Sequence, residues 1–258
     1  MNPNNPVSAE YLKESAKAAE ALKQKTYERM EIEAGDSVLD AGCGVGVDTI
    51  KLVDFVGADG KVVGVDFDEV MLIEADKLIA THPLRERIFH EKGDVLNLAY
   101  ADESFDAVRA ERLLQVLPKL HEKRIVSELA RVTKQAGRLV LADTDWASAS
   151  VAMGDDALER RLLRFFGDVM RPNGYAGRNL FALLKEANFH EVNVDIFPMV
   201  SYSVAQTPFG AWLSKEALAH NIATKEEIEK WQSTLASLEA QGKFYSCVNM
   251  VVVSGVKK

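Results

Sequence analysis

The chain has 258 residues and a formal net charge of −8, which suits one large α/β domain and, with acidic and basic residues mixed, disfavours a nucleic-acid partner. No run of about 18 apolar residues occurs and the N-terminus has no signal-peptide core, so we expect a cytoplasmic protein without a membrane span. The two cysteines, Cys43 and Cys247, stand far apart and predict neither a disulfide framework nor a metal site.

The N-terminal segment predicts a helix over residues 8–30, because Ala, Glu, Lys and Leu dominate it and Gly and Pro are absent. The apolar stripe of this helix is weak. Two arrangements fit the pattern equally well: residues 1–34 form a lid over a ligand, or the helix packs on the edge of a sheet.

A strand, an acidic residue and a turn of alternating glycines follow. Residues 37–40 predict a buried strand that ends at Asp40, and Gly42, Gly44 and Gly46 lead into a helix over residues 47–55. Glycine lets a ligand lie against the backbone, and the N–H groups of the following helix point at that ligand. The stretch therefore predicts a nucleotide-type site.

The identity of the ligand depends on two positions of this turn. A dinucleotide fingerprint requires a third glycine at the position that Val47 occupies. Asp40 would repel a pyrophosphate, whereas its carboxylate accepts hydrogen bonds from an ammonium group. These features favour a ligand with a zwitterionic amino-acid tail, and a nicotinamide oxidoreductase is the less favoured alternative.

The second predicted strand, residues 61–66, also ends in an acid. Asp66 lies 20 residues beyond the last glycine of the turn, the spacing at which a carboxylate accepts from ribose hydroxyls in nucleoside-binding α/β folds. The alternative is an N-cap of the next helix, for which Asp68 is equally suited. Phe67 and Met71 are expected beside the nucleoside.

Strands and helices continue to alternate along the chain. Five strand–helix units in succession imply a parallel sheet with helices on both faces and a site at the carboxyl ends of the strands. Further predicted helices cover residues 69–81, 122–133, 179–187, 209–220 and 224–240, and further strands cover 88–90, 104–111, 138–143, 191–200 and 244–253.

The run Asp40-Ala41-Gly42-Cys43-Gly44-Val45-Gly46 resembles the first motif of the class I S-adenosylmethionine-dependent methyltransferases. Over residues 35–255 the chain is most similar to their menaquinone/ubiquinone-type branch. The resemblance implies a Rossmann-like α/β fold with a seven-stranded, mostly parallel sheet, helices on both faces, an antiparallel last strand and helical lid insertions. It also implies S-adenosyl-L-methionine as cofactor, S-adenosyl-L-homocysteine as product and a small-molecule acceptor.

The same resemblance assigns cofactor contacts. In this family an acid after glycine, here Asp94, meets the adenine amino group, and the next backbone N–H, here that of Val95, meets the ring; a purely local turn hydrogen bond is the alternative for Asp94. Residues 109–111 would line the methionine moiety, chiefly through their backbone. The expected cofactor residues are Asp40, Ala41, Gly42, Gly44, Gly46, Asp66, Phe67, Met71, Asp94, Val95, Arg109, Ala110 and Glu111.

The acceptor region contains no diagnostic motif. Methyl transfer depends mainly on positioning, and an enolate, phenolate or amine acceptor needs no general base, so the catalytic residues are not defined by the reaction. Candidates for a catalytic role are His121, Asp145 and Tyr175. Candidates for the acceptor pocket are Trp146, Arg171, Asn173, Tyr175, Phe209 and Trp212, with ordinary packing as the alternative for each.

We therefore expect one domain over residues 1–258, with a cofactor-binding half at 35–145 and a substrate-side half at 146–258. Helical insertions are expected at 146–176 and 207–241 of the substrate-side half. The oligomeric state is expected to be a monomer or a homodimer. A cofactor-binding protein that does not methylate, such as a cyclase or a binding subunit, is the alternative function.

Overall fold

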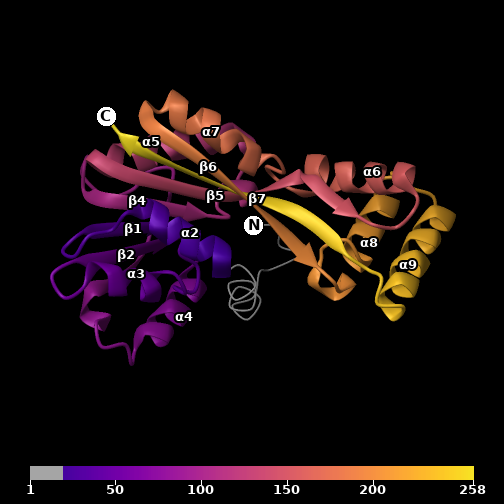
Figure 1. The fold of residues 1–258 in the computed structure, drawn as a ribbon, viewed down its shortest axis with the longest axis horizontal. Coiled ribbons are helices and arrows are strands. Elements are labelled where there is room, and N and C mark those ends of the chain that lie inside the picture. Colours follow the sequence, from indigo (N-terminus) through magenta and orange to yellow (C-terminus); the bar gives the residue numbers. More distant parts are fainter. Residues whose placement is uncertain (1–19) are drawn as a thin grey trace.

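The computed structural model describes residues 20–258, which form a seven-stranded sheet with helices on both faces (Figure 1). The strand order is β3-β2-β1-β4-β5-β7-β6. Strands β1 to β5 pair in parallel, and β7 is antiparallel to both β5 and β6. The strands are β1 (Ser37–Ala41), β2 (Lys61–Asp66), β3 (Ile88–Lys92), β4 (Phe105–Glu111), β5 (Thr133–Val151), β6 (Phe189–Ser201) and β7 (Ser246–Lys257). The predicted fold class is confirmed.

Eight α-helices lie within the described residues. They are α2 (Glu20–Met30), α3 (Thr49–Val56), α4 (Glu69–Ile79), α5 (Glu122–Val132), α6 (Asp156–Phe165), α7 (Ala176–Glu186), α8 (Ala211–Ala219) and α9 (Lys225–Ala240). Short helical turns cover Arg85–Arg87, Leu114–Val116, Lys119–His121, Phe166–Met170 and Val204–Gln206. The predicted N-terminal helix is present over residues 20–30, and the rest of that prediction lies outside the described residues.

Two apolar cores follow from the alternation of side chains along the parallel strands. On one face, Leu39 and Val108 join apolar residues of α5 and α7. On the other face, Val38 and Ala107 join residues of α2, α3 and α4. The strands carry apolar residues on both faces, as buried parallel strands do.

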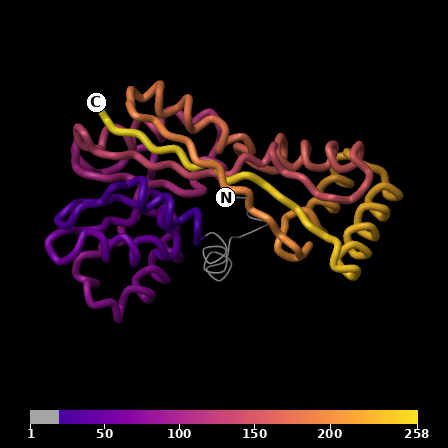
Figure 2. Tube along the Cα trace, in the orientation of Figure 1, coloured from indigo at the N-terminus to yellow at the C-terminus, as the bar shows by residue number. Residues whose placement is uncertain are grey.

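Strands β5, β6 and β7 run beyond the parallel part of the sheet and reach a second group of helices, α6, α8 and α9 (Figures 1 and 2). This group has its own apolar core around Trp231, which is fully buried and donates from Nε1 to the Phe209 carbonyl at 2.9 Å. The prediction that residues 146–176 are a helical insertion is wrong at its start, because β5 pairs with β7 as far as Val151, opposite Ser246.

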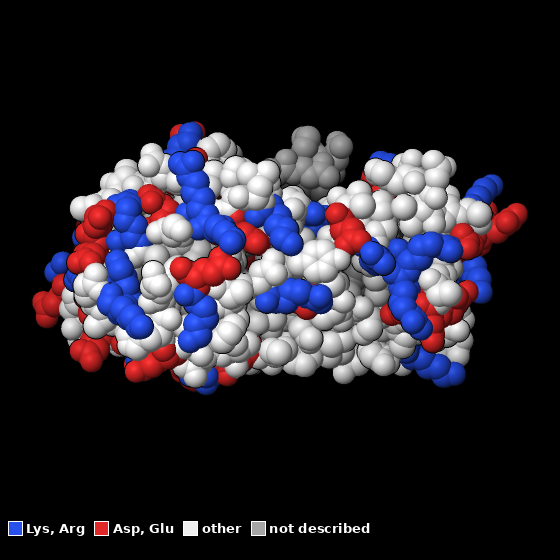
Figure 3. Space-filling view, turned by 90° about the horizontal axis from the view of Figure 1, so that it is seen from above, with Lys and Arg blue, Asp and Glu red and all other residues white. Residues whose placement is uncertain are grey.

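The surface carries charges of both signs. Figure 3 shows one face of the molecule, on which lysine and arginine side chains are interspersed with aspartate and glutamate. In the part of the chain that the structure describes, no helix has the length and apolar character needed to cross a membrane.

Candidate functional site

The glycine turn after β1 has the conformation that the sequence predicts. Gly42, Gly44 and Gly46 have φ angles of 77°, 53° and 71°, in the left-handed region that side chains with a Cβ rarely adopt. The Gly42 N–H donates to the Val65 carbonyl at 2.7 Å, which holds the turn against the end of β2. The turn is therefore a fixed backbone platform at the carboxyl end of the parallel strands.

Asp40 is the penultimate residue of β1, beside this turn, and is only 1% exposed. Its Oδ1 accepts a hydrogen bond from Arg109 Nη1 at 2.9 Å, whereas its buried Oδ2 has no hydrogen-bond partner among residues 20–258. Burial raises the pKa of this carboxyl to about 6, because desolvation disfavours the charged form. A buried carboxylate oxygen without a partner is costly, so Asp40 is poised to accept from a cationic ligand.

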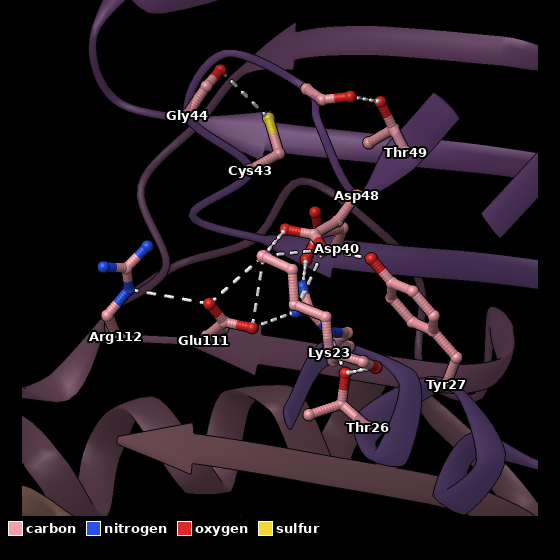
Figure 4. A network of polar contacts seen from close by, with 12 residues as sticks. Lys23, Thr26, Tyr27, Asp40, Cys43, Gly44, Asp48, Thr49, Glu111 and Arg112 are labelled. Carbon is pink, nitrogen blue, oxygen red and sulfur yellow. Dashed lines mark hydrogen bonds and ion pairs between the residues drawn. The ribbon is translucent and has the colours of Figure 1, made fainter. Parts of the chain in front are cut away.

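Arg109 is the centre of a buried network of charged side chains (Figure 4 shows most of its members). Besides Asp40, its guanidinium contacts Asp48 at 3.2 Å, Thr26 Oγ1 at 3.0 Å and the carboxylate of Glu111. Burial alone would lower the pKa of Arg109, but the surrounding carboxylates outweigh it and raise that pKa. The arginine is thus charged and held by acids from three different segments.

Besides Thr26, helix α2 contributes two further side chains to the network. Lys23 Nζ lies 2.6 Å from Asp48 Oδ2 and 3.2 Å from Glu111 Oε1, and the Tyr27 hydroxyl donates to Asp48. Burial would raise the pKa of Asp48, but Arg109 and Lys23 hold it below its usual range. Helix α2 is therefore fastened over the carboxyl ends of the strands by ion pairs, and not only by apolar packing.

Asp66 connects the glycine turn to β2. Its Oδ2 accepts from the Gly44 N–H and its Oδ1 from the Asp68 N–H, both at 2.9 Å. Asp68 caps α4 by accepting from the Val70 N–H at 2.9 Å, which confirms that part of the prediction. Each carboxylate oxygen accepts more than one hydrogen bond, so the predicted contact of Asp66 with ribose hydroxyls is compatible with this arrangement and stays a prediction.

The other predicted adenosine contacts lie at the same edge of the sheet. Phe67 is 74% exposed, and Met71 is buried. Asp94 is exposed and accepts from the Leu96 N–H at 2.9 Å, which is the local turn hydrogen bond that the sequence offers as the alternative. Val95 packs in the core. Adenine recognition by Asp94 and Val95 stays a prediction.

Four of the predicted acceptor residues meet in one aromatic cluster. The Arg171 guanidinium lies 4.6 Å from the ring centre of Trp146, 4.8 Å from that of Phe166 and 5.5 Å from that of Trp212. Phe209 packs edge-on against Phe166, with ring centres 5.5 Å apart. Phe166, the first residue of the short helical turn Phe166–Met170, is a member of this cluster that is not among the predicted acceptor residues.

Trp146 is bonded to the helical turn after β4, and the Asn173 side chain to the start of α5. Trp146 Nε1 donates to Gln115 Oε1 at 2.6 Å, and Asn173 Nδ2 donates to Glu122 at 3.0 Å. Asn173 is 2% exposed, and its Oδ1 has no hydrogen-bond partner within the described ranges. Gln115 is a site residue that sequence reasoning missed, since no local pattern distinguishes it.

The three candidate catalytic residues are not assembled into a unit. Asp145 accepts two hydrogen bonds from Arg178, at 2.9 and 2.8 Å. The Tyr175 hydroxyl donates to Asp168, which raises the pKa of that tyrosine. His121 stands at the N-cap of α5, half-buried. Asp145 and Tyr175 both contact Arg178, whose guanidinium lies 5.2 Å from the tyrosine ring centre, but each already has a partner.

Asp143 is a buried acid that the sequence reading overlooked. It is fully buried on β5 and accepts from the N–H groups of Leu114 at 2.8 Å, Gln115 at 3.2 Å and Thr144 at 2.8 Å. Asp143 therefore fixes the turn that presents Gln115. Burial is the main cause that raises the pKa of Asp143 to about 7.

The raised pKa of Asp143 predicts a pH-dependent contribution to stability. The folded state prefers the protonated acid, so this contribution is largest below the unfolded pKa of about 4 and is lost as the pH rises towards 7. We expect the stability advantage of the native chain over Asp143→Asn to shrink between pH 5 and pH 8 by on the order of 2 kcal/mol. Urea unfolding of both proteins at the two pH values measures this, and an advantage that grows with pH would contradict it.

Cavities elsewhere in the molecule do not involve these residues. One of about 380 Å³ is lined by residues of β2 and β3 and by Tyr100, and one of about 370 Å³ lies between α8 and α9. Within residues 20–258, no group of three or more His, Cys, Asp or Glu side chains is arranged to hold a metal ion.

Comparison with known proteins places this geometry in a family. Residues 38–137, which run from β1 into β5 and include the glycine turn, match the methyltransferase domain family model. Over these residues the chain is similar to methyltransferases. The resemblance that the first motif suggests is thus confirmed.

Two curated proteins show how far along the chain the similarity extends. The chain is 36% identical over 122 residues to a demethylmenaquinone methyltransferase of Lactobacillus johnsonii, which covers 47% of this chain and 49% of that protein. It is 29% identical over 241 residues to an uncharacterized 37.1 kDa protein in transposon Tn4556 of Streptomyces fradiae, covering 92% and 67%. The chain thus spans about half the length of the demethylmenaquinone methyltransferases that it matches.

Solved structures share the fold of this chain. The YcgJ protein of Bacillus subtilis aligns with a TM-score of 0.64 at 17% identity, covering 93% of this chain and 99% of that one. A putative methyltransferase of Bacillus halodurans aligns with a TM-score of 0.63 at 21% identity, covering 92% and 99%. Identities this low establish the architecture and leave the acceptor open.

The residues of this site fit S-adenosylmethionine, the cofactor that the similarity to methyltransferases implies. Asp40 Oδ2 is a buried acceptor without a partner among the described residues, beside glycines that leave room for a ligand against the backbone. Asp66 lies at the end of the next strand, where ribose hydroxyls would reach it. When bound, S-adenosylmethionine supplies a methyl group activated by its sulfonium, and the protein supplies the binding and the orientation.

Proposed function

We propose that the protein transfers a methyl group from S-adenosylmethionine to a small-molecule acceptor. The observation that carries this proposal is the unpartnered, buried Oδ2 of Asp40 next to the left-handed glycine turn. An ammonium group gives this oxygen a charge-assisted hydrogen bond, and the amino-acid end of S-adenosylmethionine carries one. A pyrophosphate in the same place would be repelled by the acid.

The proposed acceptor-binding half of the chain comprises residues 146–258. The aromatic cluster of Trp146, Phe166, Phe209 and Trp212 surrounds the Arg171 guanidinium, and the polar groups of Gln115 and Asn173 lie at its side. Aromatic walls with one fixed cation suit a planar, partly anionic metabolite such as a phenol or a quinone precursor. Residues 35–145 bind the cofactor, and α2, in residues 1–34, covers the site.

The proposal is tested by incubating the purified protein with methyl-labelled S-adenosylmethionine and a panel of phenols, quinols, carboxylates and amines. Transfer of label to at least one acceptor class supports the proposal. Tight cofactor binding without label transfer to any acceptor would favour the alternative function, a cofactor-binding protein that does not methylate, such as a cyclase or a binding subunit.

The acceptor site predicts a selective effect of Trp212→Ala. Truncating one aromatic wall removes an interaction of the kind worth about 0.5–1.5 kcal/mol, so we expect KM for the acceptor to rise about 2- to 12-fold while the Kd for S-adenosylmethionine is unchanged. Steady-state kinetics and calorimetry separate the two quantities. Phe181→Ala, which removes a 43% exposed aromatic side chain on α7, is the control, and an equal effect of both variants would contradict the assignment.

The cellular setting is proposed from composition. We infer that the protein acts in the cytoplasm on a small molecule, without nucleic acid, as a monomer or a homodimer. The net charge of −8 and the mixed surface support this, because nucleic-acid binding relies on clustered positive charge. Light scattering coupled to size-exclusion chromatography measures the oligomeric state, and a mass above that of a dimer would overturn that part.

A further inference from the structure

A second polar chain lies beneath the glycine turn. Asp76 Oδ1 on α4 is 2.8 Å from His90 Nδ1 on β3, and His90 Nε2 is 2.9 Å from Thr49 Oγ1 at the start of α3. Thr49 Oγ1 is also 3.0 Å from the carbonyl of Gly46. The side chain of His90 is fully buried, whereas that of Asp76 is 64% exposed. These groups link a surface carboxylate to the backbone of the turn.

The number of available hydrogen atoms decides which of these bonds coexist. The carboxylate of Asp76 only accepts, so His90 Nδ1 carries a proton. The Gly46 carbonyl also only accepts, and the single hydroxyl hydrogen of Thr49 points either to it or to His90 Nε2. All three contacts are satisfied together only when Nε2 is protonated as well, which makes His90 an imidazolium.

When His90 is neutral, the Gly46 carbonyl loses its hydrogen bond from the Thr49 hydroxyl. The Thr49 hydroxyl then donates to Nε2, and the Gly46 carbonyl keeps the Ile50 N–H at 3.3 Å as its partner. Protonation of His90 reverses the bond between the ring and Thr49, so that Nε2 donates and the hydroxyl hydrogen is released to Gly46.

The turn rests directly on these side chains. A Cβ at Gly46 would lie 3.0 Å from His90 Nε2 and 3.1 Å from Thr49 Oγ1. A Cβ at Gly64 on β2 would lie 2.9 Å from both His90 Cδ2 and Cys43 Sγ. The backbone at these glycines therefore lies so near the side chains that no methyl group fits between them, and small changes in the side chains reach the turn.

We propose that Asp76, His90 and Thr49 position the glycine turn, and that protonation of His90 strengthens cofactor binding because the Thr49 hydroxyl then donates to the Gly46 carbonyl. This inference rests on the proposed function, because it concerns the same cofactor site. His90 and Thr49 are positioning residues that act through the turn.

Other charged groups around His90 determine how the test is read. Asp76 on α4 and Cys43 in the turn lie against it, and burial raises the pKa of the Cys43 thiol, which keeps that thiol neutral. Lys92 on β3 pairs with Glu69 on α4 at 2.9 Å. Asp40 has the opposite effect on affinity, because its protonation below about pH 6 weakens ammonium binding. Variants of Thr49 and His90 therefore have to be compared with the native chain at every pH.

The test combines calorimetry and NMR on the full chain. S-adenosylhomocysteine is titrated into the native chain, Thr49→Ser, Thr49→Val and His90→Gln between about pH 5 and about pH 8, the range in which histidine titrates. We expect native affinity relative to Thr49→Val to fall about 2- to 10-fold from about pH 5 to about pH 8, the equivalent of one hydrogen bond. Thr49→Ser keeps the hydroxyl and this dependence, and His90→Gln loses the dependence.

The NMR arm follows the imidazole nitrogens of His90 and the amide signals of Gly46 and Ile50 without cofactor. We expect those amide signals to shift with the His90 titration in the native chain and in Thr49→Ser, but not in Thr49→Val. Identical pH profiles of affinity for Thr49→Val and Thr49→Ser would overturn the proposal that Asp76, His90 and Thr49 position the turn. Amide signals of Gly46 and Ile50 that do not change together with the imidazole signals of His90 would also overturn it. Absence of S-adenosylhomocysteine binding at every pH would overturn the proposed function, and the NMR arm would still decide whether His90 controls the turn.

Discussion

Substitution of Arg109 by methionine is expected to lower the free energy of unfolding by about 3–5 kcal/mol, because it leaves buried carboxylates without their cation. Arg109 contacts Asp40 at 2.9 Å and Asp48 at 3.2 Å, and it is 1% exposed. Lys23 still faces Asp48, but it does not reach Asp40 among the ion pairs of the described residues. Urea unfolding monitored by circular dichroism measures the loss.

Two further variants show whether the loss comes from the network. Arg109→Lys keeps the charge but loses the planar fork that contacts several carboxylates at once, so we expect an intermediate loss. Arg87→Met removes an exposed arginine of a short helical turn and is expected to change stability by less than about 0.5 kcal/mol. Equal stability of Arg109→Met and Arg87→Met would show that the network contributes nothing.

The second large effect is expected at Asp40. The variant Asp40→Asn should weaken binding of S-adenosylmethionine by about 10- to 100-fold, which corresponds to the loss of one hydrogen bond between charged groups. Asparagine has an NH₂ donor in place of one of the two carboxylate oxygens of Asp40, and this donor faces either Arg109 or the ammonium group of the ligand, both of which are donors themselves. Calorimetric titration gives the Kd directly, and a thermal melt of the same sample verifies that the variant is folded.

The pKa of Asp40 adds a pH signature to this prediction. Because burial raises that pKa to about 6, the carboxyl loses its charge below this pH, and the native affinity for the cofactor should fall there on account of Asp40. Asp40→Asn has no such titration, so its affinity should lack that fall. Asp59→Asn, at an exposed position in the turn after α3, is the control. If this control binds S-adenosylmethionine as weakly as Asp40→Asn does, the result would contradict the role of Asp40.

The parallel half of the fold follows from local sequence. Buried strands such as Lys61–Asp66 are rich in valine, and the left-handed φ angles at Gly42, Gly44 and Gly46 are the reason why glycine occupies these positions. The cap at Asp68 depends only on an N–H two residues away. Features that are decided within a few residues of the chain are the ones that sequence reasoning predicts well.

The rest depends on contacts between distant segments. An arginine within the apolar strand Phe105–Glu111 gives little local hint of its partners, because all of them but Glu111 come from residues 26, 40 and 48 on other elements. The extension of β5 to Val151 similarly depends on β7, almost a hundred residues later. The same holds for Phe166 and Gln115, whose roles appear only once Trp146 and Arg171 are placed beside them.

The central claim is that the glycine turn and Asp40 bind S-adenosylmethionine. Calorimetric titration of the native protein with S-adenosylmethionine and S-adenosylhomocysteine, with NADH and NADPH as controls, tests it most directly. We predict micromolar binding of the first pair and none of the second. Binding of the nicotinamide cofactors instead, or of neither pair, would contradict the assignment of this site.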